Sequence, residues 1–199
     1  MRTAMPDEAR LRDLLSRPAG ASSDYDLNPD VVLPPGRKLR PAAVLIPVWL
    51  RDGGARVILT KRSSELKHHP GQVAFPGGKV DATDATPEAA ALRETREEIG
   101  LQPDRVTVLG RLPAHETVTG FSVTPVLGLL RGAFVAVPEA GEVEEVFDVP
   151  LDHVLDPANF AIERRLWRGQ WRRYYTVPWG PYYIWGATAR ILRGLAGRA

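Results

Sequence analysis

Apolar and polar residues alternate along the chain in patterns that predict a series of strands with an amphipathic helix at each end. Leucines recur at helical spacing in residues 7–16, and apolar side chains follow a 3.6-residue period in residues 183–198. Residues 18–41 are rich in Pro, Gly, Ser and Asp and predict an ordered arm. Strands are predicted at residues 42–50 (interrupted by Pro47), 56–60, 106–112, within 117–130, 139–149, 162–167 and 171–177. This order favours one α/β domain built on a mixed sheet.

A further helix is predicted at residues 87–99, because start and stop signals bound it on both sides. Thr86 is a suitable N-cap, Pro87 suits the first helical position, and Glu88 places a negative charge in the first turn. Gly100 is the residue type expected just past the last turn.

Three carboxylates share one face of this helix. At about 100° per residue, Glu94, Glu97 and Glu98 fall within an arc of about 100°. Like charges at this spacing destabilise a bare helix, so they require a compensating partner. A hard divalent cation such as Mg²⁺ is one candidate. A solvated acidic face, paired with Arg93 and Arg96, is the alternative.

Composition limits the remaining possibilities. The 199 residues suffice for one sizeable core, and the absence of cysteine excludes disulfides, thiol catalysis and cysteine metal sites. No apolar run approaches the roughly 18 residues of a membrane-spanning helix. We expect residues 1–40 to form a helix and an arm, residues 41–199 to form the main domain, and the location to be cytoplasmic by default.

The net charge of +2 is unevenly distributed. Residues 139–156 hold seven acidic residues and no Lys or Arg, whereas residues 160–199 hold eight arginines and one glutamate. A basic end can contact nucleic acid or an anionic membrane, but segregated surface charge is the simpler interpretation. We therefore expect no membrane partner and no specific nucleic-acid partner, and the oligomeric state stays open.

Cations gather just ahead of the Gly77-Gly78 loop that leads into the acidic helix. Lys61, Arg62 and Lys67 lie within residues 59–78. Cations beside a carboxylate centre suit a polyphosphate substrate, because they neutralise oxygens that a metal ion does not reach. The alternative is a basic loop whose cations pair with nearby acids.

The glycine loop and the acidic helix together resemble the Nudix box. That motif runs glycine, five residues, glutamate, seven residues, Arg-Glu, two residues, Glu-Glu, one residue, glycine. Gly78 and Asp84 match its first part, with aspartate in place of glutamate and one additional residue before the arginine. The second half matches completely, in the run from Arg93 to Gly100.

The resemblance implies a Nudix fold, an α/β/α sandwich with a mixed curved sheet, and hydrolysis of a nucleoside diphosphate linked to another group. It implies that Glu94, Glu97, Glu98 and the Gly78 loop bind Mg²⁺ or Mn²⁺. Arg93 would orient Glu97. The catalytic base would be Glu97 or an acid beyond the box, for which Glu142, Glu144 and Glu145 are the candidates.

The upstream segment resembles the pattern that marks the coenzyme A pyrophosphatases within the Nudix proteins. Residues 58–60, Arg62, Ser63, Gly71 and residues 75–78 keep its spacing, and Lys67 replaces its second arginine. A later segment around residues 119–125 also resembles this subfamily. The resemblance implies that substrate contacts come from a set of six residues: Arg62, Lys67, Gly71, Phe75, Thr119 and Phe121.

Coenzyme A or an acyl derivative is therefore the expected small-molecule substrate, cleaved to 4′-phosphopantetheine and adenosine 3′,5′-bisphosphate. Another Nudix diphosphatase, acting on ADP-ribose, NADH or a damaged nucleotide, would share the box without needing the upstream pattern. A non-catalytic nucleotide-sensing module is an alternative of a different class. Such modules typically have a broken box, whereas the three helix glutamates are intact here.

Overall fold

The computed structural model describes residues 7–66, 69–167 and 169–199. Its principal elements, in chain order, are α1 (Asp7–Ser16), β1 (Ser22–Ser23), β2 (Arg40–Arg51), β3 (Gly54–Arg62), β4 (Val73–Ala74), β5 (Gly77–Lys79), α2 (Pro87–Ile99), β6 (Val106–Arg111), β7 (His115–Glu116), β8 (Phe121–Arg131), β9 (Val143–Pro150), α3 (Leu151–Leu155), β10 (Ala161–Trp167), β11 (Gln170–Thr176) and α4 (Gly186–Ala196). Short 3₁₀ turns lie at Pro103–Arg105 and Pro157–Asn159.

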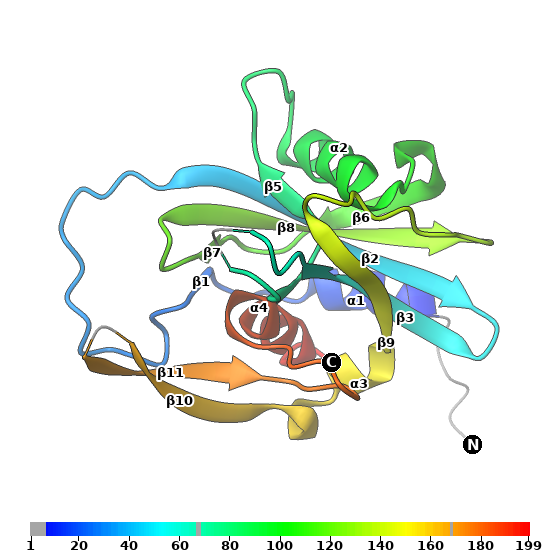
Figure 1. The fold of residues 1–199 in the computed structure, drawn as a ribbon. Helices are drawn as coiled ribbons and strands as arrows, with labels where there is room; N and C mark the ends of the chain where they lie inside the picture. The colour runs from blue at the N-terminus through cyan, green and yellow to red at the C-terminus, as the bar shows by residue number, and fades with distance from the viewer. Residues whose placement is uncertain (1–6, 67–68, 168) are drawn as a thin grey trace.

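The main sheet is mixed and is built around β2. Strand β2 runs parallel to β8 along its whole length, and it pairs antiparallel with β5 at one end and with β3 at the other. Strands β9 and β4 extend the sheet beyond β3, and β6, β7 and β1 lie at the β8 side. Strands β10 and β11 form a separate two-stranded sheet that packs on α4 (Figure 1).

Two apolar layers cover the two faces of this sheet. On one face α2 buries Ala90, Ala91 and Ile99 against β2 and β8. On the other face α1, α3 and α4 enclose a larger core, as Figure 1 shows. The expected α/β class, with helices on both faces of a mixed sheet, is confirmed. In the described part of the chain, no helix is both long and apolar enough to cross a bilayer.

Pro47 does not interrupt its strand, contrary to expectation. The Leu45 backbone N–H donates to Pro76 O (2.9 Å), so residues of this parity direct their N–H groups toward β5 and β3, away from β8. Pairing with β5 ends at Val44, and pairing with β3 begins at Val48. The N–H that proline lacks therefore falls in the gap between two ladders, where no strand requires it.

The closing helix begins three residues later than expected, at Gly186 instead of residue 183. Ile184 and Trp185 are extended, because Val177 N donates to Ile184 O (2.9 Å) and Trp185 bridges to Thr176. This pairing with the end of β11 outweighs the apolar helical period. The acidic strand is also shorter than expected at its start, since residues 139–142 form a turn before β9.

Candidate functional site

The caps of α2 determine where the helix begins and ends. Thr86 has an extended backbone (φ −149°) and its Oγ1 accepts from Ala89 N (3.2 Å). Pro87 occupies the first turn, and Gly100 ends the helix with a left-handed backbone (φ 73°). The helix boundaries expected from the sequence are therefore confirmed.

The three box glutamates differ strongly in burial. Glu98 is only 5% exposed and its Oε2 accepts from Gly77 N (3.1 Å). Burial raises the pKa of Glu98 to about 7, against the lowering effect of that hydrogen bond and of the Arg62 charge. Burial also raises the pKa of Glu94, whereas the Glu97 side chain is half exposed. A buried carboxyl (Glu98) and a partly buried one (Glu94) beside an exposed one (Glu97) together favour an additional positive charge nearby.

The glycine pair brings the backbone of β5 against these carboxylates. A Cβ at position 78 would lie 2.5 Å from the Glu94 carboxyl carbon, so only glycine leaves that carboxylate its space. Gly77 has a φ of +150°, and a Cβ there would lie 2.4 Å from Ala43 O. Position 77 therefore excludes a side chain because backbone atoms would clash with it, whereas a side chain at position 78 would displace the Glu94 carboxylate.

Arg93 holds the acidic residues of the loop and the helix together. Its guanidinium forms two hydrogen bonds to Asp84, Nε to Oδ1 (3.1 Å) and Nη2 to Oδ2 (2.8 Å). Its Nη1 donates to Glu94 Oε1 (3.0 Å) and to Glu97 Oε2 (3.1 Å). Asp84 is the main cause of a raised Arg93 pKa, and Arg93 in turn holds the Asp84 pKa below its ordinary value. The Arg93–Glu97 contact expected from the sequence is present, as one part of a larger network.

The acids of β9 and the turn before it separate into different environments. Glu139 N donates to Glu98 O (2.9 Å) and Glu142 N donates to Glu139 O (3.1 Å), so the turn that carries Glu142 is bonded to the end of α2. After burial, the Glu142 charge is a further cause of the raised pKa values of Glu94 and Glu98. Glu144 instead pairs with Lys61 (2.7 Å). Glu145 accepts from the Tyr182 hydroxyl, on the α4 side of the sheet. Of the three candidates, only Glu142 is brought to the box helix.

Lys61 and Arg62 lie at the end of β3, just before a loop whose two ends are hydrogen-bonded to each other. Arg62 N donates to Gln72 O (2.9 Å) and Gly71 N donates to Arg62 O (3.1 Å), so the two ends of the loop are bonded together. The register of β3 with β9 shifts between Lys61, which pairs with Glu145, and Arg62, which pairs with Val143. The positive charge of Arg62 lowers the pKa of Glu98, against the larger effect of burial, so this charge acts on the carboxylate site.

The other residues that are expected to contact substrate lie in different parts of the fold. Phe75 is 5% exposed and belongs to the core. Thr119 and Phe121 lie at the turn before β8, which is separated from β5 by β2. Lys67 lies outside the described residues. The structure therefore places Arg62 beside the box carboxylates, and Thr119 and Phe121 at a separate edge of the same sheet.

Comparison with known proteins assigns the family. Residues 39–169 match the family model described as "NUDIX domain". The chain belongs to the Nudix family.

Its relatives agree with this assignment. The chain is similar to "Uncharacterized Nudix hydrolase NudL" of Enterobacter sp. (strain 638), with 44% identity over 160 residues, covering 79% of this chain and 81% of the relative. A protein of the same name from Salmonella newport (strain SL254) is 45% identical over 157 residues, with the same coverage. A solved Nudix hydrolase from M. smegmatis, RenU, superposes with a TM-score of 0.50 and 29% identity, covering 59% of this chain and 74% of that one.

Nudix hydrolases generally use divalent ions such as Mg²⁺ or Mn²⁺, and the donor set here fits such an ion. Glu94, Glu97, Glu98 and the Gly78 carbonyl offer hard oxygen donors. The space beside the Gly78 Cα is filled by the Glu94 carboxylate, which therefore lies against the backbone of β5. Arg93 now engages Glu94 and Glu97, and within the described ranges no three His, Asp or Glu side chains already surround a common point.

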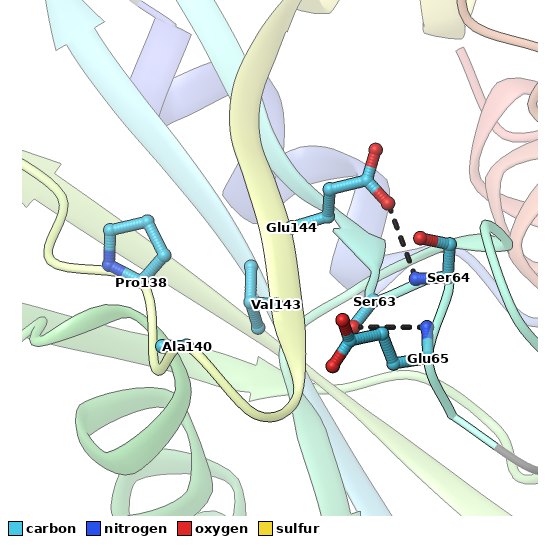
Figure 2. Close-up of a pocket in the computed structure, with 7 residues that line it drawn as sticks. All are labelled: Ser63, Ser64, Glu65, Pro138, Ala140, Val143 and Glu144. Atoms are coloured by element: carbon cyan, nitrogen blue, oxygen red, sulfur yellow. Dashed lines mark hydrogen bonds between the residues drawn. The ribbon is translucent and has the colours of Figure 1, made fainter.

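An open hollow of about 440 Å³ lies next to this site, between the loop after β3 and the start of β9 (Figure 2). It is lined by Ser63, Ser64, Glu65, Pro138, Ala140, Val143 and Glu144. Ser63 N donates to Glu142 O (2.9 Å), so one wall of the hollow is bonded to the turn that carries Glu142. The hollow lies beside the carboxylates and not over them.

Replacing Arg93 with glutamine is expected to lower the melting temperature at pH 7 by several degrees, because three carboxylates lose their common cation. Asp84 has a lowered pKa, so its contribution to stability is present above its unfolded pKa and is lost as the pH falls through the folded value. The difference between variant and wild type should therefore shrink toward pH 3. Arg96→Gln, at an exposed position on the same helix, is the matched control. Equal melting temperatures for the Arg93 variant and wild type at pH 7 would contradict this assignment.

Proposed function

We propose that the protein hydrolyses the diphosphate of coenzyme A or of an acyl derivative, releasing 4′-phosphopantetheine and adenosine 3′,5′-bisphosphate. The observation that carries this proposal is the position of Arg62. The upstream pattern that resembles the coenzyme A pyrophosphatases contains Arg62 and Gly71, whose backbones are hydrogen-bonded to each other, and the Arg62 charge acts on Glu98. A cation at this place suits a substrate with several phosphate oxygens.

The side chains of this chain would divide the work as follows. Glu94, Glu97, Glu98 and the Gly78 carbonyl would hold the divalent ion. When bound, that ion supplies Lewis-acid chemistry, which neutralises diphosphate oxygens and makes water more acidic. Arg93 keeps Glu94 and Glu97 in fixed orientations through its hydrogen bonds.

In the hydrolytic step a water oxygen forms a new bond to one phosphorus atom while the bridging P–O bond breaks. A carboxylate takes the proton of that water. Glu97 is suited to this role because its side chain is half exposed, and Glu142 because it lies beside Glu94 and Glu98. Arg62 would offset the charge of the diphosphate or of the 3′-phosphate.

Turnover on a small substrate panel tests the proposal. The panel holds coenzyme A, acetyl-coenzyme A, ADP-ribose, NADH and 8-oxo-dGTP, each with Mg²⁺ and with Mn²⁺. Preference for the coenzymes, with release of adenosine 3′,5′-bisphosphate, is the expected result. Preference for ADP-ribose or NADH would overturn the substrate and keep the box chemistry. Binding without turnover on every substrate would indicate a sensing module.

Lys67→Ala is expected to raise the KM for coenzyme A about tenfold, and to raise the KM for ADP-ribose less, because only the coenzyme carries a 3′-phosphate for this cation. Lys38→Ala, at an exposed position on the arm, is the control for simple loss of positive charge. Equal effects of Lys67→Ala on both substrates would remove this contact from the proposal.

A further inference from the structure

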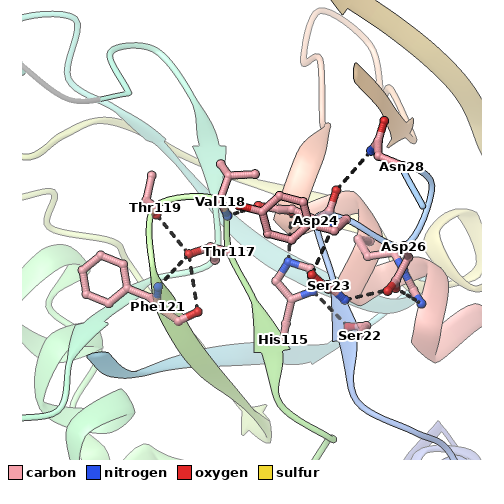
Figure 3. Close-up of polar contacts among 12 residues, drawn as sticks. Ser22, Ser23, Asp24, Asp26, Asn28, His115, Thr117, Val118, Thr119 and Phe121 are labelled. Atoms are coloured by element: carbon pink, nitrogen blue, oxygen red, sulfur yellow. Dashed lines mark hydrogen bonds and ion pairs between the residues drawn. The ribbon is translucent and has the colours of Figure 1, made fainter. Parts of the chain in front are cut away.

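The N-terminal arm is bonded to the turn that precedes β8. Ser22 N donates to Ala114 O (3.0 Å) and Asp24 N donates to Glu116 O (2.9 Å), so β1 lies parallel to β7. Figure 3 shows that the Ser22 and Asp24 side chains point toward His115, and that Asp24 also faces the turn at residues 117–121. The arm is therefore part of the sheet edge that carries this turn.

His115 is fully buried between two arm side chains. Its Nε2 lies 3.1 Å from Asp24 Oδ1 and its Nδ1 lies 2.9 Å from Ser22 Oγ, and its exposed fraction is 0%. A carboxylate only accepts hydrogen bonds, so Nε2 donates to Asp24. Hydrolase triads use the same three residue types, but there Nε2 faces the serine and can reach substrate. A buried ring in the reverse orientation indicates a structural connection instead.

The second oxygen of Asp24 reaches the turn itself. Asp24 Oδ2 accepts from Val118 N (2.9 Å), so one carboxylate joins the buried ring to the turn backbone. Within the turn, Thr117 Oγ1 accepts from Phe121 N (3.1 Å) and lies 3.0 Å from Thr119 Oγ1. Asp24 therefore binds the turn from a separate segment of the chain, while Thr117 accepts a hydrogen bond from within the turn itself (Figure 3).

The same turn is linked to the box loop through the first residues of β2. Arg40 Nη2 donates to Thr119 O (3.1 Å), and the Arg40 guanidinium lies 4.0 Å from the centre of the Phe121 ring. The next residue, Pro41, accepts from Val80 N (3.1 Å), directly after β5. A shift of the turn would thus affect both of its proposed substrate contacts and strand β5, which contains Gly78.

We infer that Asp24 is a positioning residue that orders the turn at residues 117–121 for substrate binding. The inference rests on the proposed function, in which Thr119 and Phe121 contact substrate. Asp24 itself does not touch the reacting atoms. Its role is to hold the Val118 backbone and the His115 ring in one arrangement, so that the turn is ordered before substrate arrives.

Asp24→Ala tests this role, and Asp26→Ala is its matched control. Asp26 lies on the same arm but binds Arg190 on α4 (2.7 Å), not the turn. Asp24→Ala is expected to raise the KM for coenzyme A about tenfold, with kcat within about twofold of wild type, because a charge-assisted hydrogen bond on the turn is lost. Amide hydrogen exchange in residues 117–121 should become faster in this variant and not in the control.

Asp24→Asn provides the conservative comparison. Its amide oxygen can still accept from Val118 N, so it should recover part of the KM and part of the exchange protection. An unchanged KM with a loosened turn would overturn the inference, as would equal KM changes in the Asp24 and Asp26 variants. If wild type rejects coenzyme A, the proposed function fails separately. The same variants are then compared on the substrate that the panel does identify, while the exchange measurement still reports on the turn.

Discussion

Replacing Glu98 with glutamine is expected to lower turnover at least about a hundredfold, because an ionisable oxygen donor is lost from the proposed metal site. The fold should be retained, since the glutamine oxygen can still accept from Gly77 N. Steady-state kinetics with Mg²⁺ and Mn²⁺, alongside circular dichroism, measures this effect.

The same variant should be more stable than wild type when metal is removed with a chelator at pH 8. Burial raises the pKa of Glu98 from 4.5 to about 7, so the ionised group destabilises the native state by roughly 3 kcal/mol above pH 7. A folded pKa above the unfolded value means that this cost is absent below about pH 4.5 and grows as the pH rises to 7. We expect a melting temperature about 5 °C higher at pH 8, with the gain vanishing near pH 4.5.

Glu88→Gln is the matched control, because Glu88 lies on the first turn of α2 and pairs with Arg111. It should keep wild-type turnover and show no such gain at pH 8. Near-native turnover in Glu98→Gln would remove Glu98 from the site, whereas lost turnover without the stability gain would contradict the burial argument.

Gly78→Ala is expected to lower turnover by about a hundredfold with little change in melting temperature. The new methyl group would lie 2.5 Å from the Glu94 carboxyl carbon, so that carboxylate must rotate away. Glu94 is a flexible side chain, so the rotation costs little stability, but it moves an oxygen donor out of the site. Kinetics and thermal unfolding of the same preparation separate the two effects.

Gly20→Ala is the control for an added methyl group, because nothing lies within 4 Å of a Cβ at that position. A Gly78→Ala protein with normal turnover would show that the contact between the β5 backbone and Glu94 has no part in catalysis. A Gly78→Ala protein that unfolds would show that the loop, and not the side chain, absorbs the clash.

The box helix could be predicted from the sequence because its information is local. Thr86, Pro87 and Gly100 act on the backbone within one turn of themselves, so their effect does not depend on the rest of the fold. The sharing of one face by the glutamates follows from helical geometry alone. Their different burial could not be predicted, because it depends on how β5 and the turn before β9 approach the helix.

The features that sequence reasoning missed depend on distant partners. Pro47 is tolerated only because two different strands end and begin beside it. The late start of α4 depends on pairing with the end of β11. The sequence predicts an ordered arm without indicating its partners, and Asp24, Asp26 and Asn28 bind three separate elements. These three short polar residues occupy every second position of the chain. That pattern is the one sequence signal that could have indicated a segment bound to the rest of the fold.

The different environments of the three acids after the box helix also depend on distant parts of the chain. Glu142, Glu144 and Glu145 are equivalent by composition, and their separation depends on the register shift between Lys61 and Arg62. The substitution of Asp84 for the usual glutamate is easier to interpret in hindsight, because the shorter carboxylate forms a two-point contact with Arg93.

The docking of α1 against the opposite end of the chain bears on how the protein is made. Leu11 and Leu14 are buried in the core that α4 completes, Arg17 donates to Arg198 O, and Arg198 Nη1 donates to Leu14 O (3.4 Å). On the ribosome, α1 emerges before α4, and the surface that receives α1 is completed only when α4 has been synthesised. The leucine face of α1 is therefore exposed to solvent until α4 is available to cover it, and during that time it can bind chaperones or make wrong contacts.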